Sequence, residues 1–183
     1  MKSIAVYCGA SDGARPIYAD AARALARSLV EHNIALVYGG GRVGLMGVIA
    51  DEVLRLGGEA TGVIPRALVE REVGHAGLTR LFVVKDMHER KAMMAELSEG
   101  FIAMAGGMGT LEELFEMLTW AQLGIHAKPI GLLNTDGFYD GLIGFVRHQQ
   151  EEGFVRPAHA GLMHVDADAG ALVKRLREAA GIR

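Results

Sequence analysis

Residues 101–123, FIAMAGGMGTLEELFEMLTWAQL, contain an apolar run, a glycine-rich turn and a long amphipathic segment in direct succession. The run at 101–104 predicts a strand, and apolar residues recur at helical spacing over 111–123. A strand that passes through glycines into a helix is the building unit of an α/β fold, and the ligands of such folds bind beyond the strand ends.

The same unit recurs along the chain. Further strands are predicted at 3–8, 34–38, 60–64, 81–85 and 130–133, and helices at 16–32, 45–56, 87–98, from after 133 to about 150, and at 167–179. The segment 66–77 is expected to be a loop or a frayed helix. The strands are apolar throughout, which fits burial on both faces of a parallel sheet. We therefore expect a single doubly wound, Rossmann-like α/β domain over residues 1–183, with a mostly parallel sheet flanked by helices.

Composition excludes several classes of protein. The 183 residues include 19 basic and 22 acidic side chains, for a formal net charge of −3, and half are hydrophobic. This balance argues against disorder and gives no support for a nucleic-acid partner. One cysteine cannot pair within the chain, and no apolar run is long enough to cross a membrane. The seven histidines are scattered, so we expect no metal site. Because residues 1–7 show no clear cleavable signal and no span is present, we expect a cytoplasmic protein.

Three glycine-bearing turns follow predicted strands, at Gly9, at 39–44 and at 106–109. In a parallel sheet all three lie at the same edge. Glycine lets a backbone approach a ligand closely, and the helix that follows offers unpaired amides and the positive end of its dipole. Tight turns alone also explain glycine, but three on one edge favour a phosphate site.

The predicted helix at 111–123 has two distinct faces. Its core stripe is expected to contain Leu111, Leu114, Phe115 and Leu118, with Glu112, Glu113, Glu116 and Trp120 opposite. Trp120 together with Met117 suggests that this outer face meets another subunit. Thr110 and Glu113 also match a capping box, which is a purely structural alternative for both residues.

The predicted helix at 87–98 places a charge in its apolar stripe. Arg90 shares that stripe with Met93 and Met94, so it must either leave at the helix end or project into the ligand cleft. Lys91 adds a second positive charge, and two cations opposite glycine turns suit a phosphate monoester. Asp86 is expected to cap this helix, and Cys8 to be an inert core thiol.

Several of these motifs together resemble the Lonely Guy family of cytokinin riboside 5′-monophosphate phosphoribohydrolases, which are often misnamed lysine decarboxylases. The resemblance rests on the stretches 87–91 (MHERK) and 105–113 (AGGMGTLEE), and extends to 8–11 (CGAS), 38–41 (YGGG), 44–47 (GLMG) and 119–124 (TWAQLG). It covers almost the whole chain. One departure is Ala105, where the family usually has proline.

The resemblance implies hydrolysis of the N-glycosidic bond of a nucleoside 5′-monophosphate, without metal or organic cofactor, in a homodimer whose site lies near the subunit interface. The family's catalytic arginine and glutamate fall on Arg90 and Glu113. A carboxylate can stabilise the positive charge that develops on the sugar or activate water, and an arginine can position phosphate or base. The expected substrate-binding residues are Gly9, Ser11, Gly40, Gly41, Gly44, Met46, Glu72, Lys91, Gly106, Gly107, Met108, Gly109, Thr110 and Glu112, of which Glu72 rests on the resemblance alone.

Other functions stay open at this stage. The sequence does not distinguish cytokinin monophosphates from AMP, and a non-catalytic nucleotide-binding module would share the same turns. Gly39-x-Gly41-x-x-Gly44 matches a dinucleotide fingerprint, and Arg66 lies near the distance for a 2′-phosphate, which would suit an NADP-dependent enzyme. Amino-acid decarboxylation is the weakest alternative, because the chain shows no evident site for pyridoxal phosphate.

Overall fold

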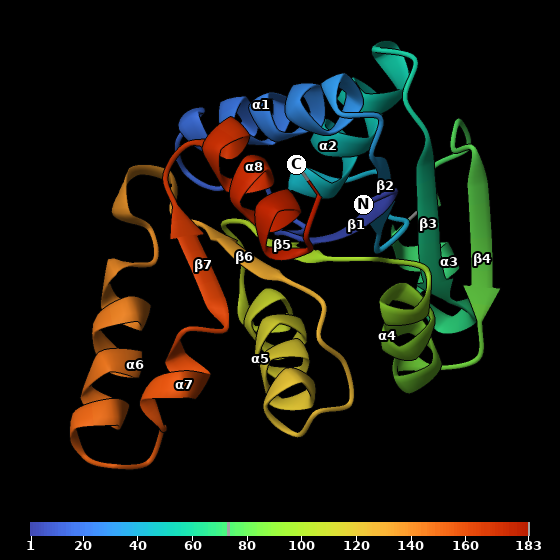
Figure 1. Cartoon of the computed structure of the whole chain (residues 1–183). Helices are drawn as coiled ribbons and strands as arrows, with labels where there is room; N and C mark the ends of the chain where they lie inside the picture. Colours follow the sequence, from blue (N-terminus) through green and yellow to red (C-terminus); the bar gives the residue numbers. More distant parts are fainter. Residues whose placement is uncertain (73, 183) are drawn as a thin grey trace.

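The protein forms one seven-stranded parallel sheet between two layers of helices (Figure 1). This computed structural model describes residues 1–72 and 74–182, without the side chains of residues 70–72. The strand order is β4-β3-β2-β1-β5-β6-β7. In chain order the strands are β1 (Ser3–Tyr7), β2 (Ala35–Tyr38), β3 (Ala60–Pro65), β4 (Arg80–Val84), β5 (Phe101–Ala103), β6 (Ile130–Leu133) and β7 (Met163–Asp166).

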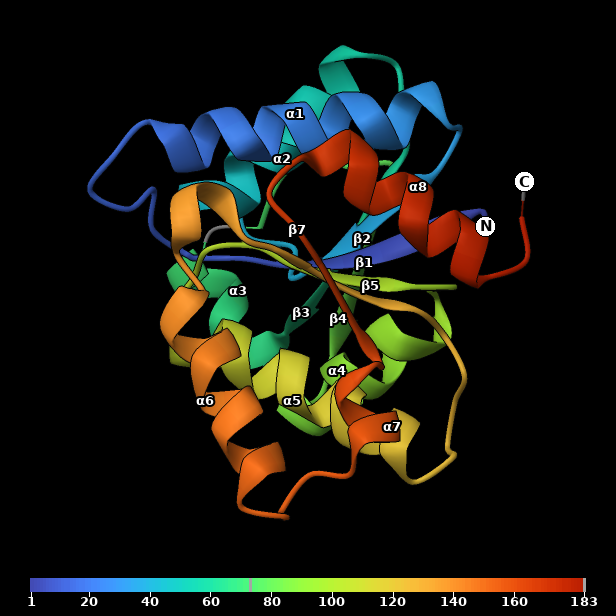
Figure 2. The same cartoon turned by 60° about the vertical axis from the view of Figure 1, so that its left-hand side comes forward.

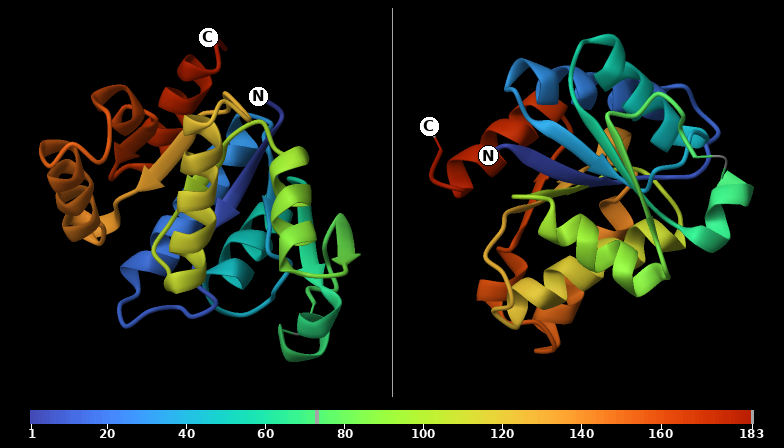
Figure 3. Two further views of the ribbon diagram at one scale, coloured as in Figure 1. Left: turned by 90° about the horizontal axis from the view of Figure 1, so that it is seen from below. Right: turned by 90° about the vertical axis from the view of Figure 1, so that its right-hand side faces the viewer.

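The helices divide between the two faces of this sheet. They are α1 (Ile17–Glu31), α2 (Gly44–Arg55), α3 (Arg66–Glu72), α4 (Met87–Glu96), α5 (Met108–Gln122), α6 (Asp140–Glu151), α7 (Pro157–Ala160) and α8 (Ala169–Ala179), with a short 3-10 turn, η1 (Thr135–Gly137). Helices α1, α2 and α8 cover one face, and α4 and α5 cover the other (Figure 2). Seen from below, α4 and α5 lie side by side across the sheet, while α6 lies beyond its edge (Figure 3).

Each face has its own apolar core. The first joins alternate residues of the central strands, such as Ile4 and Leu36, to Leu25 of α1 and Ile49 of α2. The second joins the intervening residues to α4 and α5. Because successive side chains of a strand point to opposite faces, strands buried on both sides need apolar residues at every position. The expected α/β fold is therefore confirmed.

The edges of the sheet differ from the sequence-based expectation. Strand β4 is an edge strand, and Val83 is 49% exposed, so burial on both faces holds for the central strands only. Strand β7 and helix α7 were not predicted, because both are short and β7 is only partly buried. The segment after β3 forms helix α3. Within the described residues, no helix is both long and apolar enough to span a membrane.

The strand order reverses between β1 and β5. β1 leads out to β2, β3 and β4 on one side, whereas β5 leads to β6 and β7 on the other. The turns that leave β1 and β5 therefore diverge to opposite faces of the sheet. Open α/β sheets bind ligands in the crevice that such a divergence creates.

Candidate active site

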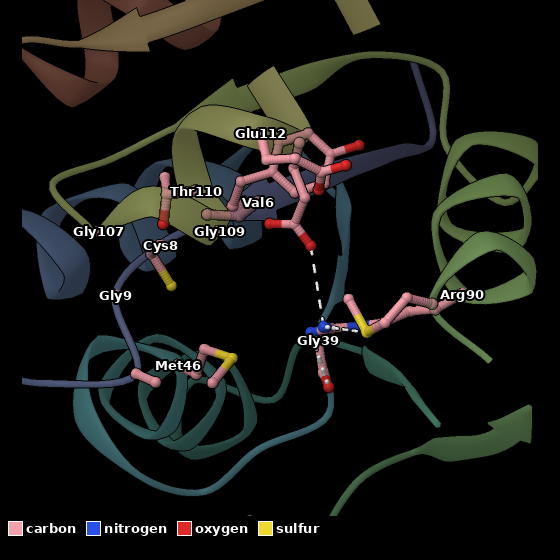
Figure 4. Close-up of a pocket in the computed structure, with 14 residues that line it drawn as sticks. Val6, Cys8, Gly9, Gly39, Met46, Arg90, Gly107, Gly109, Thr110 and Glu112 are labelled. Carbon is pink, nitrogen blue, oxygen red and sulfur yellow. Dashed lines mark hydrogen bonds and ion pairs between the residues drawn. The ribbon is translucent and has the colours of Figure 1, made fainter. Parts of the chain in front are cut away.

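A cavity of about 240 Å³ opens at this point, beyond the carboxyl ends of β1, β2 and β5 (Figure 4). It brings together the three glycine-bearing turns and the first turns of α4 and α5. Its lining consists of Val6, Tyr7, Cys8, Gly9, Ala10, Gly39, Met46, Met87, Arg90, Gly107, Gly109, Thr110, Glu112 and Glu113.

Arg90 projects into this cavity rather than out to solvent. Helix α4 begins at Met87 with Asp86 as its N-cap, as predicted, and this places Arg90 in the first helical turn. Its Nε donates to the carbonyl of Val63 at 3.1 Å, and its Nη2 donates to the carbonyl of Gly39 at 3.3 Å. Arg90 is only 8% exposed, and its guanidinium is bonded to the backbone of β3 and of the turn that follows β2. A side chain at Gly39 would collide with it, so this glycine is required for the position of the arginine.

Glu113 faces Arg90 across the cavity. Its Oε1 lies 4.0 Å from Nη1 of Arg90, and the residue is 8% exposed. Burial raises the pKa of the carboxyl to about 7, although the charge of Arg90 opposes the rise and the nearby carboxylate of Glu112 adds to it. The side chain therefore changes its charge near neutral pH, in a site that also holds a fixed cation.

The capping-box alternative for Thr110 and Glu113 does not hold in the structure. Helix α5 begins at Met108, with Gly107 as its N-cap, and no side-chain capping bond is found at this described turn. Thr110 and Glu113 lie inside the helix, and both line the cavity. Neither residue therefore caps the start of α5, and capping does not explain why a threonine and a glutamate occupy these positions.

The amino terminus of α5 also borders the cavity. The first amides of an α-helix have no partner within the helix and attract anions. A Cβ added at Gly107 or at Gly109 would meet no atom of the described chain within 4 Å, so both positions leave room beside these amides. This arrangement can hold a phosphate group.

The other predicted site residues divide into four groups. Gly9, Met46 and Glu112 line the same cavity, while Ser11 and Gly106 line an adjoining one of about 440 Å³ that shares Gly9 and Gly107. Gly40, Gly41, Gly44 and Met108 line neither, and Met108 is 85% exposed. The side chain of Glu72 lies outside those that the structure describes.

Lys91 does not supply the expected second cation opposite the glycine turns. It lies outside the cavity lining and is 6% exposed, and its Nζ donates to Glu112 and, at 3.1 Å, to Glu116. Burial lowers its pKa, but these two carboxylates outweigh burial and raise the pKa overall. Lys91 ties α4 to α5 from the side of the site.

The predicted faces of α5 also need correction. Met117 is fully buried in the chain's own core, and Trp120 packs against that core, so this pair does not form a free outer face. Phe115, which was expected in the core stripe, is 36% exposed. The helix is rotated relative to the prediction, because its amino terminus must turn Thr110 and Glu113 toward the cavity.

Sequence analysis did not identify Tyr7 and Met87 as lining residues. It placed Gly39 in a glycine turn but did not predict that its carbonyl accepts from Arg90. Tyr7 is the last residue of β1, directly before the first glycine turn, and that position could have identified it. Cys8, expected to be an inert core thiol, lines the cavity but is 8% exposed, and burial raises its pKa.

Comparison with known proteins adds independent evidence. Residues 46–176 match the family model described as "Possible lysine decarboxylase". A probable cytokinin riboside 5′-monophosphate phosphoribohydrolase of Oryza sativa subsp. japonica is 48% identical over 97% of this chain and 73% of its own length. A cytokinin riboside 5′-monophosphate phosphoribohydrolase of Arabidopsis thaliana is 47% identical over 96% of this chain and 77% of its own length.

Solved structures agree on the fold. The molybdenum cofactor carrier protein of Chlamydomonas reinhardtii superposes with a TM-score of 0.72 over 98% of both chains, at 22% identity. The molybdenum cofactor binding protein of Rippkaea orientalis gives the same TM-score at 19% identity, over 96% of this chain and 95% of its own. At these identities the likeness concerns the fold only.

Proposed function

This chain belongs to the family of cytokinin riboside 5′-monophosphate phosphoribohydrolases, and we propose that it releases the free base from such nucleotides in the cavity between α4 and α5. The reaction is hydrolysis of the N-glycosidic bond, which yields the base and ribose 5-phosphate. The observation that carries this assignment is the opposition of Arg90 and Glu113 beside the amino terminus of α5.

The proposed binding mode places the phosphate at the amides of Gly107–Gly109, with the hydroxyl of Thr110 beside it. These groups lie on the first turn of α5, and Glu113 follows one turn later on the same helix. A nucleotide held by its phosphate at the helix terminus therefore presents its sugar to Glu113. Selection for the phosphate follows, because the corresponding nucleoside cannot use the helix terminus.

The chemistry follows from the two opposed charges. Breaking the bond to the base develops positive charge on the sugar carbon, and an ionised Glu113 can stabilise that charge or activate the attacking water. A guanidinium group is a poor proton donor in proteins, so we give Arg90 no role in proton transfer. We assign to it the electrostatic positioning of the phosphate or the departing base.

The test is to incubate the protein with isopentenyladenosine 5′-monophosphate and with AMP, and to separate free base by chromatography. We expect base release that is lost in Glu113→Ala and in Arg90→Ala, and much slower reaction of the corresponding nucleosides. Equal turnover of Glu113→Ala and the unmodified protein would refute its catalytic role. Tight binding of NADPH without base release would instead support the dinucleotide alternative.

We also propose that the chain forms a homodimer through the outer face of α5. Phe115 on α5 is 36% exposed, and Leu123 and Ile125, directly after the helix, are 67% and 62% exposed. Apolar surface of this kind supports a subunit interface. In light scattering, Leu123→Asp should reduce the mass to that of one chain, while Ile17→Asp, at a partly exposed isoleucine of α1 on the opposite layer, should not. An unmodified protein that is monomeric at micromolar concentration would contradict the proposal.

A further inference from the structure

Lys91 is a buried lysine with two acidic partners. It directly follows Arg90 on α4 and is 6% exposed, yet it is not among the residues that line the cavity. Its Nζ donates to Glu112 and, at 3.1 Å, to Glu116, both of which belong to α5. Lysine is rarely buried unless it is paired, but one carboxylate is enough to pair it. The second carboxylate therefore requires an explanation.

Stability alone does not explain this group of charges. Taking charges out of water costs free energy, and apolar residues of similar size often stabilise a fold as well as a buried ion pair does. Helices α4 and α5 already share an apolar core, which includes Met94 of α4 and Leu114 of α5. The charge of Lys91 is therefore better explained by the groups that it holds in place.

The ion network of Lys91, Glu112 and Glu116 lies beside the proposed catalytic pair. Lys91 is the neighbour of Arg90 in the chain, and Glu112 is the neighbour of Glu113. Among the described residues, the side-chain hydrogen bonds between α4 and α5 are those that Lys91 donates. The network therefore fastens the part of α5 that carries Glu113 to the helix that carries Arg90.

The catalytic pair itself does not close into a hydrogen bond. Nη1 of Arg90 and Oε1 of Glu113 lie 4.0 Å apart, although opposite charges in a buried site attract one another. The guanidinium is retained on its own side by the carbonyls of Val63 and Gly39. On the side of Glu113, the corresponding restraint is the attachment of α5 to Lys91. A closed pair would leave neither charge free for the substrate.

The charges of the network also act on Glu113. Burial is the main cause that raises its pKa, and the carboxylates of Glu112 and Glu116 raise it further, whereas the charges of Arg90 and Lys91 lower it. With the lysine present, the network carries one unit of negative charge, and without it the network would carry two. Lys91 thus limits the repulsion that Glu113 meets when it ionises.

We propose that Lys91 is a positioning residue which, through its two carboxylate partners on α5, holds Glu113 opposite Arg90 and free to act on the substrate. This inference rests on the proposed function, in which the ionised Glu113 acts on the sugar carbon. Lys91 does not contact the substrate in this role. Its effect on the reaction passes through Glu112 and Glu116, and it should therefore change when those partners change.

The first experiment compares Lys91→Met with Lys128→Met. Lys128 donates to the carbonyl of Ala95 on the same helix at 2.7 Å and does not line the cavity, so it is the matched control. The ratio kcat/KM for base release is measured from pH 5 to 9 with isopentenyladenosine 5′-monophosphate. In Lys91→Met the acid limb should move up by about one pH unit, with an approximately tenfold loss at pH 6, because Glu113 loses a nearby cation. In Lys128→Met the limb should stay in place. The phosphate of the substrate also titrates near pH 6, but it is common to all the proteins.

The second experiment tests the opposite sign. Glu116→Gln keeps the bond from Lys91 to Glu112 and removes one carboxylate that does not line the cavity. The acid limb should move down by about half a pH unit, with an approximately threefold gain at pH 6. In Lys91→Met/Glu116→Gln the network again carries one negative charge, and the limb should return toward the parent. A limb that stays in place in Glu116→Gln would overturn the inference, even if Lys91→Met did not fold.

The separate values of kcat and KM distinguish positioning from substrate binding. At pH 9 the loss in Lys91→Met should be about tenfold in kcat, with KM within about twofold of the parent, and restoring the charge with Glu116→Gln should not recover it. A raised KM with unchanged kcat would make Lys91 a ligand of the substrate and would overturn the inference. Coincident profiles for Lys91→Met and Lys128→Met would also overturn it, while base release would leave the proposed function intact. The remaining groups that face Glu113 are unchanged in all these variants: Arg90, Glu112, Tyr7 and Cys8.

A further readout does not require activity. The difference in unfolding free energy between the parent and Glu113→Gln changes with pH through the pKa of Glu113. That change should occur at higher pH when both proteins also carry Lys91→Met, and it should not move with Lys128→Met. If the unmodified protein released no base, the proposed function would fail, and this measurement would still decide whether Lys91 acts on Glu113.

Discussion

Helices α2 and α5 both begin in glycine-rich turns at the same edge of the sheet, yet they use their glycines in different ways. A Cβ at Gly44 would collide with the backbone at Ala10 and Ser11, and a Cβ at Gly47 would collide with the turn before α2. Positions 107 and 109 of the α5 turn meet no described atom within 4 Å. The first set lets the protein pack closely on itself, and the second leaves open space beside helix amides. One sequence pattern therefore has two physical meanings.

The pKa values of the buried acids on these two helices are shifted in opposite directions. Glu52 of α2 accepts from Nε of Arg55 at 2.7 Å, and this bond, against the opposing effect of burial, holds its pKa below the ordinary value. Glu113 of α5 has its pKa raised to about 7, chiefly by burial. The bond from Arg55 stabilises the charged form of Glu52 in α2, whereas burial disfavours the charged form of Glu113 in α5.

The largest expected effect is on stability, in Gly44→Ala. Gly44 has φ +61° and lies against backbone, so an alanine there combines conformational strain with a steric clash. We expect a loss of about 4 kcal/mol in the free energy of unfolding, measured by urea titration. Gly141→Ala, in the exposed part of α6 where a Cβ meets open space, is the control and should not destabilise the protein. Wild-type stability in Gly44→Ala would show that the turn at 9–11 can move aside.

The second effect is a gain of stability in Glu113→Gln that depends on pH. The pKa of Glu113 is higher in the folded protein than in the unfolded chain. The stability that the protonated side chain contributes to the folded state is therefore fully present below about pH 4.5 and is lost as pH rises through about 7. Above pH 8 the variant should exceed the parent by up to about 3 kcal/mol, and at pH 4.5 the two should coincide.

Glu52→Gln provides the matched comparison with the opposite sign. Its folded-state pKa is lowered, so its contribution is present above about pH 4.5 and is lost as pH falls through the folded value. Arg55 is largely exposed, which limits the expected loss at pH 7 to about 1 kcal/mol or less. Thermal or urea unfolding at several pH values measures both variants. A constant difference in Glu113→Gln across this range would contradict the assigned role of burial.

The last effect is on function rather than on stability, in Gly107→Ala. Its added methyl group has room in the folded protein, so stability should change by no more than about 0.5 kcal/mol. The same methyl group would occupy space beside the proposed phosphate, and kcat/KM should fall about tenfold or more. Steady-state kinetics with the nucleotide test this, and unchanged kinetics would remove the α5 terminus from the binding site.

Much of this molecule could be predicted from its sequence. The alternation of apolar runs with helical patterns located six of the seven strands, because strands that are buried on both faces stand out as continuous apolar segments. The site at the carboxyl edge followed from the glycine turns. Arg90 was recognised by its position in an apolar stripe, and the structure places it in the cavity.

The errors arose where local patterns compete with packing. The apolar periodicity of α5 assigned Phe115 to the core and Glu113 to the outer face, whereas the folded helix is rotated so that Thr110 and Glu113 are buried. That rotation buries Met117 and exposes Phe115. The position of Lys91 depended on Glu112 and Glu116 of another helix, and pairings between helices leave no periodic signal in a sequence.

The contact between Gly39 and Arg90 limits how this site can change over generations. A side chain at position 39 is incompatible with the guanidinium as it stands, whereas a chain that had lost the arginine would no longer be under that restriction. The two positions should therefore vary together among descendants of this protein. Any member in which position 39 carries a larger residue should hold the arginine in a different position or have lost it, and the geometry of the proposed catalytic pair should change with it.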